Sequence, residues 1–185
     1  MVNVLDKVRP KNKEQLKQLI NYAFKHNIYD LNFIDTSKIT DMSNLFINYE
    51  YDIDVSNWDV SNVTNMSAMF YCCYDFVCDL SKWDVSNVTN MNHMIFCCEN
   101  FDIKCFESWD VSNVTDMTSM FAFCNKFDCD LSNWDVSNVT GMYFMFGHCN
   151  QFNCDLSHWN TSKVKDMKDM FTGCNRLTIP DWYKK

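Results

Sequence analysis

The sequence predicts an α/β repeat fold, a solenoid in which each repeat of about 25 residues adds one short parallel strand and one short helical turn. Three observations support this expectation. They are a segment that recurs along the chain, a change of apolar spacing within each copy, and an amphipathic stretch before the first copy. The order of these elements also predicts that the N-terminal stretch is a helix that covers the first repeat.

The recurring segment is Trp-Asp-Val-Ser-Asn-Val-Thr. Full copies begin at Trp58, Trp83, Trp109 and Trp134, and degenerate copies begin at Ile34 and Trp159. A unit of this size cannot bury its own apolar face, so neighbouring copies are expected to stack. Equivalent residues of successive copies should then lie above one another in columns.

The apolar spacing predicts the elements within each copy. In the run Leu80-x-x-Trp83-x-Val85, alternation around the polar Asp84 favours a strand with Trp83 inward and Asp84 outward. Later in each copy the apolar residues lie three, three, one and three positions apart, which fits one face of a short helix.

The whole chain, 1–185, is expected to form a single repeat domain. Its predicted parts are an N-terminal cap over 1–33 with a helix at about 13–26, some six repeats over 34–177, and a C-terminal cap over 178–185. Asn12 is a good N-cap for the helix, with Gln15 three residues later.

Composition and motifs exclude several function classes. Lys and Arg total 16 against 24 Asp and Glu, a net charge of −8, which disfavours nucleic acid and anionic membranes as partners. No apolar run approaches the ~20 residues that cross a bilayer, so membrane insertion is not expected. The chain has no phosphate loop, no Gly-x-Ser-x-Gly and no His-Glu-x-x-His. We therefore expect a protein that is not an enzyme and has no cofactor.

The repeat unit Asp-Leu-Ser-x-Trp-Asp-Val-Ser-Asn-Val-Thr-x-Met-x-x-Met-Phe-x-x-Cys resembles that of the BspA-like leucine-rich-repeat family of bacterial surface proteins. The resemblance spans Ile34 to about Leu177. It implies a leucine-rich-repeat-like solenoid used for contact, a location at the cell surface or outside the cell, and no active-site motif. The missing export signal and the odd number of cysteines favour the cytoplasm instead.

Acidic residues repeat at the outward strand position, as Asp59, Asp84, Asp110 and Asp135. One interpretation is that these carboxylates accept hydrogen bonds from turn amides. The other is a weak Ca²⁺ or carbohydrate site along the column, since Ca²⁺ takes oxygen ligands. The column contains no strong metal-binding motif, so no metal is expected.

Eleven cysteines are present, and five form a full column. Equivalent Cα atoms would lie ~5 Å apart, so pairing is compatible with distance, but an odd count without a signal peptide favours reduced thiols. Zinc is disfavoured because no pair has the spacing of a structural zinc site.

Some positions in the predicted helical turns do not repeat, which indicates that stacking does not constrain them. Aromatic residues at such surface positions are typical of binding sites. The candidate partner-binding residues are Tyr143, Phe144, Phe123, Phe96, His93 and His148. The expected function is a non-enzymatic scaffold, monomeric or weakly self-associating, that binds an unidentified protein.

Overall fold

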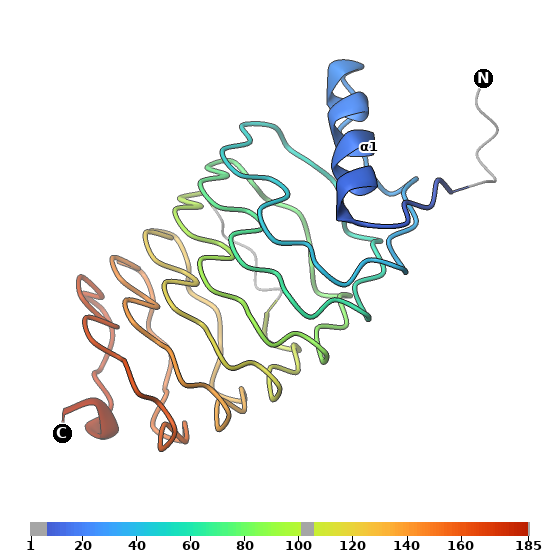
Figure 1. Cartoon of the computed structure of the whole chain (residues 1–185). Coiled ribbons are helices and arrows are strands. Elements are labelled where there is room, and N and C mark those ends of the chain that lie inside the picture. Colours follow the sequence, from blue (N-terminus) through green and yellow to red (C-terminus); the bar gives the residue numbers. More distant parts are fainter. Residues whose placement is uncertain (1–6, 101–105, 185) are drawn as a thin grey trace.

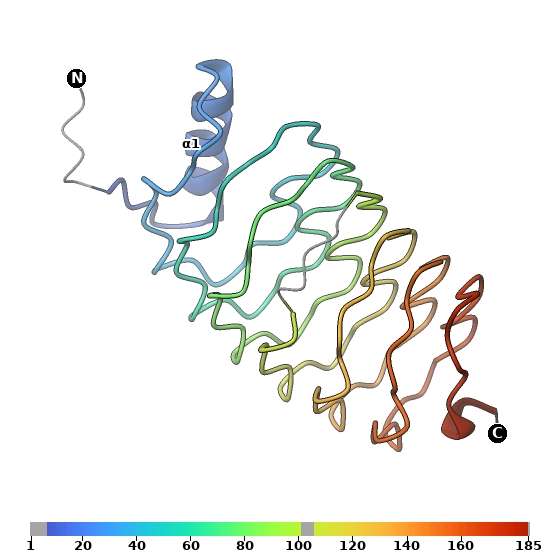
Figure 2. The same ribbon diagram turned by 180° about the vertical axis from the view of Figure 1, so that it is seen from behind.

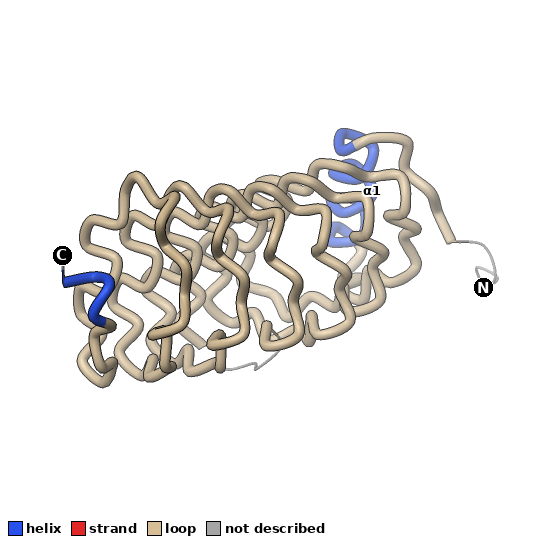
Figure 3. Tube along the Cα trace, turned by 90° about the horizontal axis from the view of Figure 1, so that it is seen from below, coloured by secondary structure: helices blue, strands red, loops and turns tan. Residues whose placement is uncertain are grey.

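The computed structural model describes residues 7–100 and 106–184. Helix α1 (Lys13–Lys25) stands at one end, and the following repeats form successive turns of chain that lie side by side (Figures 1 and 2). A short 3₁₀ helix, η1 (Asp181–Lys184), lies at the other end. Within the described ranges there is no β-strand, and the parallel pairing consists of isolated single-residue bridges (Figure 3).

Helix α1 begins where its cap predicts and packs against the first repeat. The Asn12 side chain accepts a hydrogen bond from the backbone N–H of Gln15 at 3.0 Å. On the buried face, Leu16 and Ile20 are almost fully covered. The ammonium of Lys13 binds the Asp41 carboxylate at 3.1 Å. The helix therefore covers the open end of the stack.

The predicted fold class is wrong, because the repeats contain neither strands nor helical turns in the described part of the chain. The helix fails because every second backbone N–H of the stretch is donated to the next repeat. Ala68 N–H donates to the Asn92 carbonyl at 2.8 Å, and Phe70 N–H donates to the Met94 carbonyl at 2.9 Å. These donors are unavailable for the bonds to the fourth preceding residue that an α-helix requires.

The remaining N–H groups of this stretch close a series of short turns. Met69 N–H donates to the Met66 carbonyl at 3.2 Å, three residues back. Ala68 has a φ of +51°, the left-handed value that the third residue of a type II turn requires. A series of such turns also repeats its apolar positions at intervals of three, which is why the spacing resembled that of a helix.

The predicted strand is likewise replaced by turns. Trp83 N–H donates to the Leu80 carbonyl at 3.0 Å, and Val88 N–H donates to the Val85 carbonyl at 2.9 Å. Side chains link neighbouring repeats on this side. The indole N–H of Trp109 reaches the Leu80 carbonyl at 3.1 Å, and the Asn87 amide reaches the Ser61 carbonyl at 2.8 Å. These side-chain donors supply hydrogen bonds to the two carbonyls without a β-sheet.

The columns themselves are confirmed. The rings of Trp83 and Trp109 lie 6.5 Å apart with 7° between their planes, and both side chains are buried. Bridges link Asn65 to Asn90 and Asn90 to Asp116 in the same register. Equivalent residues of neighbouring repeats are therefore spatial neighbours, although their local conformation differs from the expected one.

The full cysteine column adds one more set of links between repeats. Each thiol donates to a carbonyl of the preceding repeat, for example Cys149 Sγ to Phe121 O at 2.9 Å. The column comprises Cys73, Cys98, Cys124, Cys149 and Cys174. All ten cysteines in the described ranges are free thiols, and Cys105 lies outside those ranges.

This column makes the fold sensitive to alkaline pH. Burial raises the pKa of the Cys149 thiol well above its ordinary value. The folded state therefore holds this proton when the unfolded state has lost it. The stabilisation is complete below the unfolded pKa of about 8.5 and is lost as pH rises further, by at most about 1.4 kcal/mol per pH unit for one thiol.

We predict that Cys149→Ser, whose hydroxyl can still donate to Phe121 O, reduces the fall in melting temperature between pH 7.5 and pH 10. The measurement is circular-dichroism melting of both proteins at several pH values. Equal slopes for the two proteins would contradict a stabilising protonated thiol.

Candidate functional site

Side chains at the variable positions form one continuous surface feature, here called the aromatic strip. Its core runs across four repeats through stacked or edge-on rings. The Tyr71 and Phe96 rings lie 4.7 Å apart at 2°, Phe96 and Phe123 lie 5.4 Å apart, and Phe123 and His148 lie 5.0 Å apart at 14°. The strip comprises Tyr71, His93, Phe96, Phe123, Tyr143, Phe144 and His148.

The other rings join this core from its sides. His93 lies 5.5 Å from Phe96, Phe144 lies 5.6 Å from Phe123, and Tyr143 lies 6.0 Å from Phe144. Tyr143 is 39% exposed, and the remaining members are half-buried. The structure thus brings the six candidate partner-binding residues together and adds Tyr71, which was not among the candidates.

Four members of the strip have a left-handed backbone. The φ values are +54° at His93, +63° at Phe123, +53° at Phe144 and +59° at His148. Among non-glycine residues, Asn, Asp and His adopt this conformation most often, whereas for a residue such as Phe it costs roughly 1–2 kcal/mol. Large aromatic side chains are therefore held at backbone positions that disfavour them.

The first and last repeats carry residues that suit this backbone better. Asn44 and Asn48 occupy the two left-handed positions of the first repeat, with φ of +57° and +58°. In the last repeat these positions hold Asp169 and Gly173. The bulky rings are thus confined to the middle repeats, where they build the strip.

Two of the three glycines make room for rings of the strip. A Cβ atom at Gly147 would collide with the ring of Phe144. At Gly173, where φ is +79°, a Cβ would meet Nδ1 of His148 at 2.6 Å. The strip is therefore packed closely against the backbone beneath it.

Burial lowers the pKa of His93, and the nearby charge of Asp116 opposes this effect. The imidazole is neutral at pH 7, because its pKa lies below the ordinary value of about 6.5. The aromatic strip is consequently apolar around this residue at neutral pH.

The acidic column, which comprises Asp59, Asp84, Asp110 and Asp135, lies apart from these rings in sequence. Its carboxylates accept hydrogen bonds from Ser residues of the same turns. Asp59 and Asp84 each accept from a Ser hydroxyl two residues later at 2.6 Å. Asp110 and Asp135 each accept from a Ser backbone N–H, at 3.0 and 2.9 Å. Hydrogen bonds from Ser86 lower the pKa of Asp84, and those from Ser137 lower the pKa of Asp135.

These contacts match the turn interpretation of the column. Among residues 7–100 and 106–184, no three His, Cys, Asp or Glu side chains are grouped so that they could hold a metal ion. A Ca²⁺ or carbohydrate site on the column stays a prediction.

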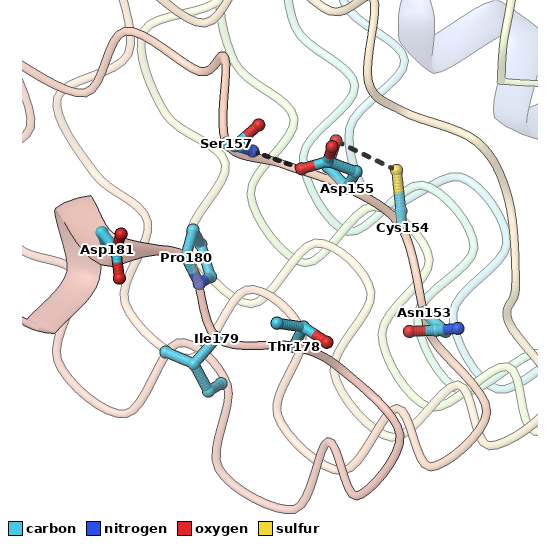
Figure 4. A pocket seen from close by; sticks show the side chains of 8 residues that line it. All are labelled: Asn153, Cys154, Asp155, Ser157, Thr178, Ile179, Pro180 and Asp181. Carbon is cyan, nitrogen blue, oxygen red and sulfur yellow. Dashed lines mark hydrogen bonds between the residues drawn. The ribbon is translucent and has the colours of Figure 1, made fainter.

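A pocket of about 530 Å³ lies at the opposite end from α1, where the chain enters η1 (Figure 4). Its lining includes Cys154, Asp155 and Pro180. The Asp155 carboxylate accepts from the Ser157 backbone N–H at 2.9 Å, and this bond lowers the pKa of Asp155. The pocket contains none of the candidate residues.

Comparison with known proteins places the chain in a family. The model of the family described as "Mycoplasma protein of unknown function, DUF285" matches residues 14–107 and 97–183. The chain belongs to this family. No curated protein and no solved structure matches it, and the resemblance to BspA-like leucine-rich repeats is not confirmed. In the described part of the chain, no helix is both long and apolar enough to cross a membrane.

The turn role of the acidic column can be tested at Asp84. Because hydrogen bonds lower its folded pKa, its stabilisation is present above the unfolded pKa of about 3.9 and is lost as pH falls through the folded value. Asn160 already occupies the same position in the last full repeat and accepts from Ser162 N–H at 3.2 Å.

We therefore predict that Asp84→Asn keeps its melting temperature at pH 7 and loses less of it than the parent protein between pH 5 and pH 2.5. The effect is small, because the carboxylate is exposed. Thermal melts over this pH range measure it. A large loss at pH 7 would show that the charge itself has another role.

Proposed function

We propose that this protein is a non-enzymatic repeat scaffold that binds a protein partner through the aromatic strip. The observation that carries the proposal is the presence of Phe123, Phe144 and two His side chains at left-handed positions. The same chain uses Asn44 and Asn48 at these positions in its first repeat. Backbone strain that packing alone does not require is typical of functional sites.

The chemistry of the strip suits protein binding. Aromatic side chains dominate the binding energy of many interfaces, because they bury a large area and lose little conformational entropy. Stacking already orders these rings, for example Phe123 against His148 at 5.0 Å. At ~4.8 Å per repeat, four repeats give a strip roughly 15–20 Å long, enough for a short extended segment or a few helical turns.

Charge favours a basic partner. Residues 50–160, which contain the whole strip, include 16 Asp and Glu residues and three Lys residues. A strongly negative surface around the strip accelerates association with positively charged proteins and disfavours the binding of acidic ones. The partner class that fits best is thus a basic protein with apolar or aromatic side chains at its contact surface.

The resemblance to BspA-like surface proteins supports the same contact role and an extracellular location. The free thiols of the cysteine column instead support a reducing compartment such as the cytoplasm. Both locations stay predictions, and the binding proposal depends on neither.

The matched test replaces rings by the residue that the chain itself uses at the same backbone position. In the double variant Phe123→Asn and Phe144→Asn, relief of left-handed strain offsets the lost packing, so we expect a melting temperature close to that of the parent. Capture of a partner from lysate of the source cell, followed by titration with the purified partner, should show binding weakened at least roughly tenfold.

Tyr22→Ser provides the control, because Tyr22 lies on α1 and is 59% exposed. This variant removes an exposed aromatic ring outside the strip and should bind like the parent. Equal affinity of the double variant and the parent would show that the strip is not the binding site. If Tyr22→Ser lowered the affinity by the same factor as the double variant, the binding would be non-specific apolar binding.

A further inference from the structure

Two half-buried cysteines meet at one end of the aromatic strip. Cys72 and Cys97 occupy the same position in neighbouring repeats, and each directly follows a ring of the strip, Tyr71 and Phe96 respectively. Those two rings stack at 4.7 Å with 2° between their planes. Cys72 N–H donates to the Phe96 carbonyl at 2.8 Å. The two repeats are therefore in register and in direct contact at this point.

The two cysteines also share one backbone conformation. Their φ values are +55° and +57°, so their Cα–Cβ bonds point in similar directions. Repeats that are hydrogen-bonded in register place equivalent Cα atoms ~4.8 Å apart, within the 4.4–6.8 Å that disulfides span. A small movement of the side chains is enough to bring the sulfur atoms to bonding distance.

The thiols influence one another and a nearby phenol. Burial, the charge of a Cys72 thiolate and a hydrogen bond with Cys72 together raise the pKa of Cys97 to about 11. The same two thiols raise the pKa of Tyr74, which is 43% exposed. Three reactive groups thus converge on one patch of accessible surface.

The neighbouring cysteine column behaves differently. Cys73 and Cys98 directly follow Cys72 and Cys97 in the sequence, but their side chains are buried and donate to backbone carbonyls. An oxidant in solution reaches the half-buried pair and not this column. The chain therefore has two adjacent pairs of equivalent thiols, of which only one pair is accessible to solvent.

We propose that Cys72 and Cys97 form a reversible disulfide by exchange with a low-molecular-weight disulfide such as glutathione disulfide. The Cys72 thiolate attacks one sulfur of glutathione disulfide, which forms a mixed disulfide and releases one glutathione thiolate. The Cys97 thiolate then attacks Cys72 Sγ, which closes the protein disulfide and releases the second glutathione. Two protein S–H bonds are lost, one S–S bond forms, and the oxidant is reduced to two thiols.

The reverse order, in which Cys97 attacks first and Cys72 closes the bond, gives the same product. Burial raises the pKa of the Cys97 thiol, so a step in which Cys97 attacks accelerates as pH rises. The product links the two neighbouring repeats that also carry the stacked rings of Tyr71 and Phe96. This inference goes beyond the binding proposal and does not depend on it.

The test treats the full chain with glutathione disulfide at pH 8.5 under native conditions. We expect the intact mass to fall by two hydrogens and the thiol titre in denaturant to fall by two from eleven. Trypsin cleaves at Lys82, between the two cysteines, so tandem mass spectrometry of the linked peptides locates the bond. A reducing agent should restore the starting mass.

Two variants provide matched controls. Cys72→Asn and Cys97→Asn introduce the residue that Asn48 already provides at this backbone position, with φ of +58°, so both are expected to fold. Each variant should accumulate a glutathione adduct on its remaining cysteine of the pair, because the thiol that would displace the glutathione is absent. A bond mapped to Cys73 and Cys98, a stable glutathione adduct on the parent chain, or no reaction of the parent would each overturn the proposal.

Discussion

The structure depends on how each repeat distributes its backbone N–H groups. Every second N–H in the turn segment goes to the next repeat, as from Ala68 to Asn92 and from Phe70 to Met94. The N–H groups between them close local turns. This division leaves no donors for a helix, and it brings successive copies into register. The columns of Trp, Met, Phe and Cys follow from that register.

The same division creates the candidate site. The turns require residues with positive φ at two positions per repeat, and every residue at these positions except Ser119 is at least partly exposed. Asn44 fits this requirement at low cost, whereas Phe144 does not. Four of the seven members of the aromatic strip therefore occupy backbone positions that large rings seldom adopt. Both the binding proposal and the cysteine pair rest on side chains at these positions.

The sequence predicted the columns and the N-terminal helix because both depend on signals in the side chains. The period of the tryptophans placed Trp83 beside Trp109, and Asn12 marked the start of α1. The conformation within a repeat was not predictable in this way, because apolar residues three positions apart suit a helix and a series of turns equally. A left-handed Phe123 has no sequence signal, since Phe normally avoids that conformation.

The links between repeats run in two opposite directions. Backbone N–H groups of the turn segment, such as that of Ala68, donate to the following repeat. Backbone N–H groups such as that of Thr89, together with the side-chain donors Trp109 Nε1 and Cys149 Sγ, donate to the preceding one. Each middle repeat therefore presents one standard face to each neighbour. Gain or loss of a whole unit would rejoin two compatible faces, whereas a change of half a unit would break the register between neighbouring repeats. Such modularity allows the length of the molecule to evolve in steps of one repeat.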